Sequence, residues 1–372
     1  MEITQIEVLP YQIPNRYEHE IASATLSALE NILIKIHTDT GIVGLGEGVA
    51  GPKWNQNPLK AETVILQEKL VPVLIGQDPT DVVGIWDVMN AVLNEHYSVK
   101  AGIDIAIHDL IGRAYGIPVW KVLGGAHRLT IDVEGPGYGI GFMNAEDAVE
   151  YAMTAVNEGC TQIELKCGRA SGAVDDLEVV RAVHEACGPA VSLKVDITEG
   201  YDFKTALSVL PQMAELGVVL AEQPLPRHQL ADLARLREAV PLDIVLDESI
   251  GSPADMLRVV QLGAADAIHL KYAMLGGFHM CQKISAICEA AGIGLQGGTG
   301  TPSGVGLAAA HHLTATLPNL VRGCHGSPLG RAHDDLVRDP VPAFATTITL
   351  DDSPGLGVEV DQDKVQTYGI SF

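Results

Sequence analysis

Five short apolar segments, each ending in a charged residue, dominate residues 161–277. They are TQIELK, ending at Lys166; VSLKVD, ending at Asp196; VVLAE, ending at Glu222; DIVLDE, ending at Asp247 and Glu248; and AIHLK, ending at Lys271. Successive segments end 24 to 30 residues apart, about the length of one strand plus one helix. In parallel βα folds the carboxyl ends of the strands share one face, which carries the active site. The pattern therefore predicts two ammonium groups and four carboxylates around one cavity.

Helical patterns alternate with these strands. Asn144 and Ser252 are expected to cap two of the helices at their N-termini, and proline follows Ser252 at the first helical position. TIDVEGPGYGI, GIGLQGG and NLVRGC supply a first, a seventh and an eighth strand. The predicted fold is therefore α/β, a (β/α)7β TIM-like barrel over residues 126–325, about 200 residues long as is usual for that fold.

The chain on either side of the barrel has a different pattern. Residues 1–125 predict an α+β capping domain: ITQIEVLPYQI and ENILIKIHTDTGIVGLGEG alternate like antiparallel strands, and residues 15–27 between them are expected to form a loop. Helical patterns follow, with Thr80 as an expected N-cap and Gly116 as a stop. Residues 326–372 are loop-rich, with a strand-like TTITL, and are expected to return to the capping domain.

The charge of the chain limits its partners. Lys and Arg number 24 against 47 Asp and Glu, a formal charge of −23, which gives no electrostatic basis for binding nucleic acid or an anionic membrane surface. The N-terminus lacks a signal-peptide pattern, and no apolar run approaches the roughly 18 residues that span a bilayer. Six scattered cysteines fit reduced thiols, so we expect a cytoplasmic protein.

Three acids at consecutive strand ends suggest a metal site. Asp196, Glu222 and Asp247 are hard oxygen donors of the kind that Mg²⁺ prefers, and no cysteine or histidine accompanies them as zinc would require. Each acid alone could be a solvated strand-end carboxylate. Three carboxylates brought close together repel one another unless a cation neutralises them, and this favours the ligand interpretation.

The two lysines suggest acid/base chemistry. Lys166 and Lys271 end the second and sixth strands, which lie on opposite sides of an eight-stranded barrel. With a lysine on each face of a bound carbon acid, one lysine could remove a proton from one side and the other could return a proton to the opposite side. The metal would stabilise the enolate formed between the two steps. Lysine together with Mg²⁺ is a combination known for enolase-type sites. The alternative is an ion pair with a nearby acid. Glu248 is expected beside the ligands as an acceptor for Lys271, or as a cap of the next helix.

These residues resemble the enolase superfamily, and within it the mandelate racemase and muconate lactonizing enzyme group. The stretches that carry the resemblance are AGIDIAIHDLIGRAYGIPVWKVLGG, ELKCG, VDITEGY, AEQPLP, LDES and LKYAMLGG. The resemblance implies that Asp196, Glu222 and Asp247 bind Mg²⁺ and that Lys166 and Lys271 are acid/base catalysts, as in the muconate-lactonizing branch. It also implies a homo-oligomer.

The chain departs from the pattern of that branch at three strand ends. Glu164 stands where the branch has the first lysine of Lys-x-Lys, and it would raise the pKa of Lys166. Thr198 replaces the asparagine of Asp-x-Asn, and His325 falls in the strand-eight segment where muconate cycloisomerases carry a glutamate.

A segment resembling the branch's cap loop is expected to choose the substrate. It directs attention to Tyr17, His19 and Trp54, with His325 from the eighth strand, as candidate substrate-binding residues.

The expected activity is Mg²⁺-dependent removal of the proton α to the carboxylate of a small-molecule substrate. Racemisation or epimerisation of an amino-acid-like carboxylate, cyclic or N-substituted, is favoured because both faces have a lysine. Muconate-type cycloisomerisation comes second, dehydration of a hydroxy acid third, and a non-enzymatic binding protein last.

Overall fold

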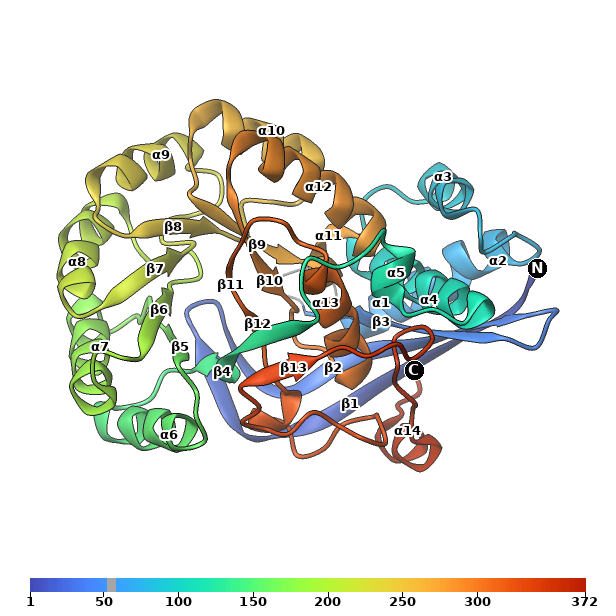
Figure 1. Ribbon diagram of the computed structural model, residues 1–372, viewed down its shortest axis with the longest axis horizontal. Helices are drawn as coiled ribbons and strands as arrows, with labels where there is room; N and C mark the ends of the chain where they lie inside the picture. Colours follow the sequence, from blue (N-terminus) through green and yellow to red (C-terminus); the bar gives the residue numbers. More distant parts are fainter. Residues whose placement is uncertain (52–57) are drawn as a thin grey trace.

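The structure is a computed structural model that describes residues 1–51 and 58–372. It contains a three-stranded antiparallel sheet in the order β1-β2-β3 and a larger sheet whose path runs β11-β10-β9-β8-β7-β6-β5-β4-β12. The larger sheet is parallel along this path and curves into a barrel with helices on its outside (Figure 1). The expected TIM-like barrel with an N-terminal α+β cap is confirmed.

The cap packs its sheet against helices. Its elements are β1 (Ile3–Ile21), β2 (Ala24–Thr38), β3 (Val43–Val49), α1 (Leu59–Ile65), the π-helical turn η1 (Leu66–Leu70), α2 (Val71–Leu74), α3 (Val82–Val92), α4 (Tyr97–Tyr115) and α5 (Val119–Val122). Inward side chains such as Ile34, Leu70 and Ile103 form one buried apolar cluster. Gly116 ends α4 in the left-handed conformation, as expected.

The N-cap of α3 is Asp81, not Thr80. The Asp81 carboxylate accepts from the backbone N–H of Gly84 at 2.9 Å. The Thr80 hydroxyl donates instead to the carboxylate of Asp78 at 2.8 Å, so it is not available to the helix.

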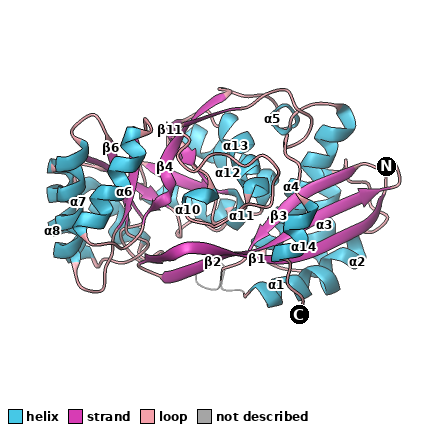
Figure 2. Cartoon of the chain, turned by 90° about the horizontal axis from the view of Figure 1, so that it is seen from below, coloured by secondary structure: helices cyan, strands magenta, loops and turns pink. Residues whose placement is uncertain are grey.

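Residues 15–27 are not a loop. They continue β1 and β2 into a long hairpin, with His19 paired to Leu26 and Ile21 to Ala24, after an irregularity between Pro14 and His19. His19 and Ile21 are buried while Glu18 and Glu20 are exposed, which is the alternation of a strand. The pattern is hard to see in the sequence because one of the inward residues is a histidine. Figure 2 shows the two strands running from the cap helices across the barrel.

The barrel alternates strand and helix. Its elements are β4 (Thr130–Ile140), α6 (Ala145–Asn157), β5 (Gln162–Lys166), α7 (Ala173–Cys187), β6 (Ser192–Asp196), α8 (Phe203–Glu215), β7 (Val218–Glu222), α9 (Leu230–Ala239), β8 (Asp243–Leu246), α10 (Pro253–Leu262), β9 (Ala267–Lys271), α11 (Tyr272–Leu275), α12 (Gly277–Ala291), β10 (Gly294–Gly298), α13 (Gly304–Ala315), β11 (Leu320–Arg322) and β12 (Cys324–His325). Asn144 and Ser252 cap α6 and α10 as expected.

The barrel closes at Gly323. β11 pairs with β10, and β12, one residue further on, pairs with β4, so the two segments together form the eighth strand. A Cβ atom at Gly323 would lie 2.0 Å from the carbonyl oxygen of Asp132. Only glycine allows the main chains to approach this closely where the strand changes partner.

The interior of the barrel carries both apolar and charged side chains. Leu220, Val245 and Ala267 form a small buried cluster on β7, β8 and β9. Register places Lys166 beside Asp196, and Asp196 beside Glu222. The polar groups at the carboxyl ends of the strands are therefore brought to one level of the barrel.

The C-terminal segment contacts both domains. After the 3₁₀ turn η2 (Pro328–Gly330), β13 (Thr347–Thr349) pairs antiparallel with β4 of the barrel. α14 (Gln362–Tyr368) lies beside the cap sheet, where the backbone N–H of Ile370 donates to the carbonyl of Pro10 at 2.9 Å. Among the described residues, none of the helices combines the length and the apolar character that a bilayer-spanning segment requires.

Candidate active site

Three acids line up at the ends of neighbouring strands. Asp196 ends β6, Glu222 ends β7, and Asp247 directly follows β8; their exposed fractions are 4%, 0% and 4%. Donor atoms of Glu222 and Asp247 lie within 4.8 Å of each other and of a ring nitrogen of His269, and Asp196 is not part of this group. The expectation that no histidine accompanies the acids is therefore wrong, since His269 Nδ1 lies 2.8 Å from Glu222 Oε1. Burial raises the pKa of Asp247 to about 7, and Glu222 contributes in the same direction while Lys271 opposes it. Glu222 and Asp196 both raise the pKa of the buried Asp247 carboxyl, and a divalent cation with oxygen ligands would favour its ionised form.

The two lysines lie at opposite ends of the row formed by Asp196, Glu222 and Asp247, which we call the acid row. Lys166 Nζ, from β5, is 2.7 Å from Asp196 Oδ2, and Lys271 Nζ, from β9, contacts Asp247 and lies 3.8 Å from Glu222 Oε1. The three strands that carry the acids lie between β5 and β9. Each amine therefore approaches the row from its own end.

The carboxylates around the two lysines favour their protonated forms. Burial lowers the pKa of Lys166, but Asp196, Glu164 and Glu222 together raise it above its ordinary value. Burial likewise lowers the pKa of Lys271, and the neighbouring carboxylates, Asp247 first, outweigh it. The sequence-based expectation that Glu164 raises the pKa of Lys166 agrees with the direction found.

Thr198 and Glu248 adjoin the row. Thr198 donates its backbone N–H and its hydroxyl to Asp196 Oδ1, at 2.8 and 2.9 Å, and so holds that carboxylate in place. Burial raises the pKa of Glu248 well above its usual range, and the neighbouring Asp247 adds to the effect. A carboxyl that resists ionisation here could donate a hydrogen bond to a ligand.

A small cavity lies where the cap hairpin meets the barrel ends. Its lining contains Lys166, Asp196, Thr198, Glu248, Lys271, His19, His325 and, from the C-terminal segment, Arg331. His19 and His325 are thus brought to the proposed catalytic groups from β1 and β12. Tyr17 is not among the residues that line this cavity. Its hydroxyl lies 3.0 Å from the hydroxyl of Tyr151 on α6. Trp54 lies outside the described residues.

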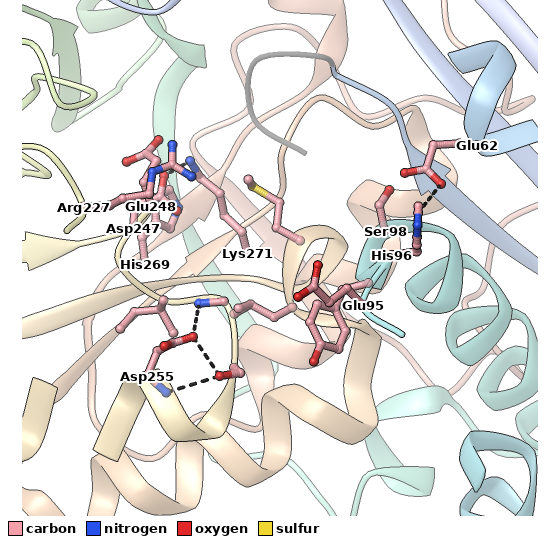
Figure 3. A pocket seen from close by; sticks show the side chains of 16 residues that line it. Glu62, Glu95, His96, Ser98, Arg227, Asp247, Glu248, Asp255, His269 and Lys271 are labelled. Carbon is pink, nitrogen blue, oxygen red and sulfur yellow. Dashed lines mark hydrogen bonds and ion pairs between the residues drawn. The ribbon is translucent and has the colours of Figure 1, made fainter. Parts of the chain in front are cut away.

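A second cavity opens on the Lys271 side. In Figure 3, Asp247, Glu248, His269 and Lys271 stand on one side of it, and Glu62 with His96 from the cap on the other. Glu248 and Lys271 line both cavities. Asp196 lines the small cavity and Asp247 lines the second one, so both cavities border the acid row.

A buried ionic cluster lies beneath the lysines and was not anticipated. Lys194 Nζ is 2.7 Å from Glu164 Oε2 and 3.5 Å from Glu134 Oε2, and it also contacts Glu222. All four side chains are fully buried. Lys194 precedes Asp196 by two residues, so strand alternation alone could have placed it on the inner face.

His325 joins this cluster to the cavity. Its Nδ1 is 2.9 Å from the hydroxyl oxygen of Thr299, and its Nε2 is 3.7 Å from Glu164 Oε2. The Glu164 carboxylate lies below the cavity lining, between Lys166 and Lys194. Burial raises the pKa of Glu164, but the opposite effect of Lys166 and Lys194 is larger, so the pKa lies well below its ordinary value.

Comparison with known proteins identifies the family of the chain. Residues 3–124 match the family description "Mandelate racemase / muconate lactonizing enzyme, N-terminal domain", and residues 147–364 match "Enolase C-terminal domain-like". Muconate cycloisomerase 1 of Rhodococcus opacus is 33% identical over 99% of this chain and 98% of its own length. The N-succinyl-L-Arg/Lys racemase of Bacillus cereus is 28% identical over 98% of this chain and 97% of its own length.

A solved structure agrees over the whole chain. The 2-chloromuconate cycloisomerase of Rhodococcus opacus superposes with a TM-score of 0.94 and 28% identity, covering 100% of both chains. Cap, barrel and C-terminal segment are therefore shared with enzymes that isomerise small carboxylates. The chain belongs to the mandelate racemase/muconate lactonizing enzyme family of the enolase superfamily and is an enolase-type isomerase.

Proposed function

We propose that this isomerase is Mg²⁺-dependent and removes the proton α to a substrate carboxylate, with Lys166 and Lys271 as the acid/base pair. The observation that carries the proposal is the placement of the two amines at opposite ends of the acid row. When bound by Asp196, Glu222 and Asp247, the cation would neutralise the acids that hold the lysine pKa values high, polarise the substrate carboxylate and stabilise the charge left by the departing proton.

The favoured outcome is racemisation or epimerisation of an amino-acid-like carboxylate, cyclic or N-substituted. One lysine, unprotonated, takes the α-proton as the C–H bond breaks; the other, protonated, donates a proton to the opposite face as the new C–H bond forms. The two lysines exchange their protonation states in each turnover, so the reaction needs no further proton donor. Thr198 supports the step by fixing the orientation of Asp196.

Cycloisomerisation of an unsaturated dicarboxylate is the second candidate. This candidate is supported by the similarity to Muconate cycloisomerase 1, which is 33% identical over 99% of this chain. In that case the distal carboxylate of the substrate adds to the conjugated C=C bond, and the displaced π electrons form an enolate on the other carboxylate. One lysine then protonates the α-carbon of this enolate, and the other lysine transfers no proton.

Incubation in D₂O with Mg²⁺ and a library of carboxylates distinguishes these outcomes. A racemase replaces the α-hydrogen by deuterium and inverts the centre, which ¹H NMR and polarimetry report. A cycloisomerase yields a lactone carrying one deuterium, and a dehydratase releases water irreversibly. Absence of exchange and of product across the library, with metal bound, would contradict the proposal and favour a binding protein.

A further inference from the structure

Gln223 joins the ends of the three strands that carry the acid row. It directly follows Glu222 at the end of β7 and is fully buried. Its backbone N–H donates to the carbonyl of Val245 on β8 at 2.8 Å, and its carbonyl accepts from the backbone N–H of Glu199, in the segment after β6, at 2.8 Å. The main chain at this one residue is therefore bonded to both neighbouring strand ends.

The Gln223 side chain holds the segment after β8, on which Asp247 lies. Its amide oxygen Oε1 accepts from the backbone N–H of Asp247 at 3.0 Å and from that of Ser249 at 3.2 Å. Its Nε2 donates to the carbonyl of Leu225 and to the hydroxyl oxygen of Ser249, both at 2.9 Å. Removal of the amide would take this acceptor away from two backbone N–H groups beside a proposed ligand.

The backbone of Gln223 adopts an uncommon conformation. Its φ is +37°, in the left-handed region that favours glycine. A glutamine kept in this conformation costs free energy that its other contacts must offset. The four side-chain bonds are such contacts, and glycine could not make them.

The spacing of the carboxylates decides which cation they fit. Mg²⁺ requires a nearly octahedral set of ligands at about 2.0–2.1 Å, whereas Ca²⁺ accepts about six to eight oxygens at about 2.3–2.6 Å in a flexible geometry. A ligand set that is held rigidly can therefore discriminate between the two ions. Loosening the set should weaken the binding of Mg²⁺ more than that of Ca²⁺.

We propose that Gln223 is a positioning residue that fixes Asp247 relative to Glu222 and thereby gives the acid row a preference for Mg²⁺ over the larger Ca²⁺. The inference rests on the proposed function, which places the cation at the row. Gln223 is not among the residues that line either cavity, so it acts through the main chain of Asp247 and not by touching the cation or the substrate.

The test measures cation binding and does not depend on turnover. Protein stripped with EDTA is titrated with Mn²⁺, and the bound Mn²⁺ is displaced by Mg²⁺ or Ca²⁺ while electron paramagnetic resonance reports the free Mn²⁺. The readout is the ratio of the dissociation constant for Ca²⁺ to that for Mg²⁺. Gln223→Met should lower this ratio about tenfold or more, because losing a group that orients a metal ligand costs about 10–100-fold in affinity and Mg²⁺ tolerates the change least.

The conservative variant should rescue the preference. Gln223→Glu retains an oxygen acceptor for both backbone N–H groups, and its added charge acts on both ions alike. We expect it to keep the ratio within about threefold of the parent value. If Gln223→Met does not fold, Gln223→Asn replaces it, because asparagine tolerates a left-handed backbone and its shorter side chain cannot reach the same partners.

Gln296→Met is the matched control. Gln296 is also fully buried, but it lies on β10 and donates to Glu134 at 2.7 Å. Its replacement should lower the melting temperature measured in EDTA, as Gln223→Met does, and should leave the ion ratio within about twofold of the parent value.

Equal affinity of the parent for the two ions, an unchanged ratio in Gln223→Met or Gln223→Asn, or an equal loss in Gln296→Met would each overturn the proposal. So would a loss in Gln223→Glu as large as that in Gln223→Met. A ratio that falls as expected in a protein without deuterium exchange would contradict the proposed function alone. An unchanged ratio in an enzyme that does exchange the α-proton would overturn this inference alone.

Discussion

Lys194 and Glu164 face each other across β5 and β6, with Nζ 2.7 Å from Oε2 and both side chains fully buried. Glu134 and Glu222 also surround the same ammonium, whose pKa they and Glu164 raise well above its ordinary value against the opposing effect of burial. Lys194 thus contacts three carboxylates beneath the proposed catalytic groups, where Lys166 also contacts Glu164 and Arg322 also contacts Glu134.

Replacing Lys194 by methionine is expected to destabilise the protein by about 3–5 kcal/mol, because it leaves buried carboxylates without their shared cation. The change should appear in urea denaturation. Lys204→Met, at an exposed lysine of α8, is the control and should change stability by about 0.5 kcal/mol or less. The double variant Lys194→Met/Glu164→Met should cost less than the sum of the single variants, since the two groups interact directly. Additive effects would show that the pair is not coupled.

Single lysine variants should make the proton exchange one-sided. Lys166→Ala and Lys271→Ala should each lower racemisation by about 100-fold to 10,000-fold. Each should still exchange the α-proton of one enantiomer, and the two variants should prefer opposite enantiomers, because each remaining amine reaches one face. Chiral chromatography combined with ¹H NMR in D₂O measures both. The same enantiomer exchanged by both variants would place the two amines on one side of the substrate.

Removing one acid of the row should weaken cation binding without unfolding the chain. Asp247→Asn is expected to reduce the affinity for Mn²⁺, used as a paramagnetic substitute for Mg²⁺, by about tenfold or more, and EDTA should abolish proton exchange in the parent protein. Electron paramagnetic resonance titration measures the free ion. Asp243→Asn, at the other end of β8, is the control and should bind Mn²⁺ as the parent does. Similar losses in both variants would argue that the ion is held elsewhere.

Glu47 joins the cap to the barrel, and its removal should weaken that contact. Its buried carboxylate accepts from the Tyr11 hydroxyl (2.6 Å) and Asn31 Nδ2 (2.8 Å) in the cap, and from Ser303 N (2.8 Å) and Gly306 N (3.0 Å) in the barrel. Glu47→Ala leaves these donors unsatisfied, so we expect a loss of about 3 kcal/mol or more in stability, measured by thermal denaturation.

The control for Glu47 comes from the neighbouring strand β2 of the same sheet. Glu30 is partly exposed and bonds only to Gln12 among the side chains described. Glu30→Ala should cost about 0.5 kcal/mol or less. A comparable loss from both substitutions would mean that the Glu47 cluster does not hold the domains together.

The strand ends were predictable because each strand is a local pattern. Apolar residues followed by Lys166, Asp196, Glu222, Asp247 or Lys271 recur at the period of a βα unit, and parallel strands must bring such ends to one face. The helix caps at Asn144 and Ser252 were found for the same reason, since capping depends on neighbours in sequence. The cap of α3 was assigned to the wrong residue because Thr80 and Asp81 are both good caps, and only the contact with Asp78 decides between them.

What the sequence determined by itself is therefore the fold and the row of chemical groups along the strand ends. Tertiary structure decided which groups share a partner. Lys194 and Glu164 meet because register aligns β5 with β6, and Arg331 reaches the cavity because the C-terminal segment is held between β1 and α6. Both depend on contacts between residues far apart in the chain, and periodicity carries no information about which distant segments will touch.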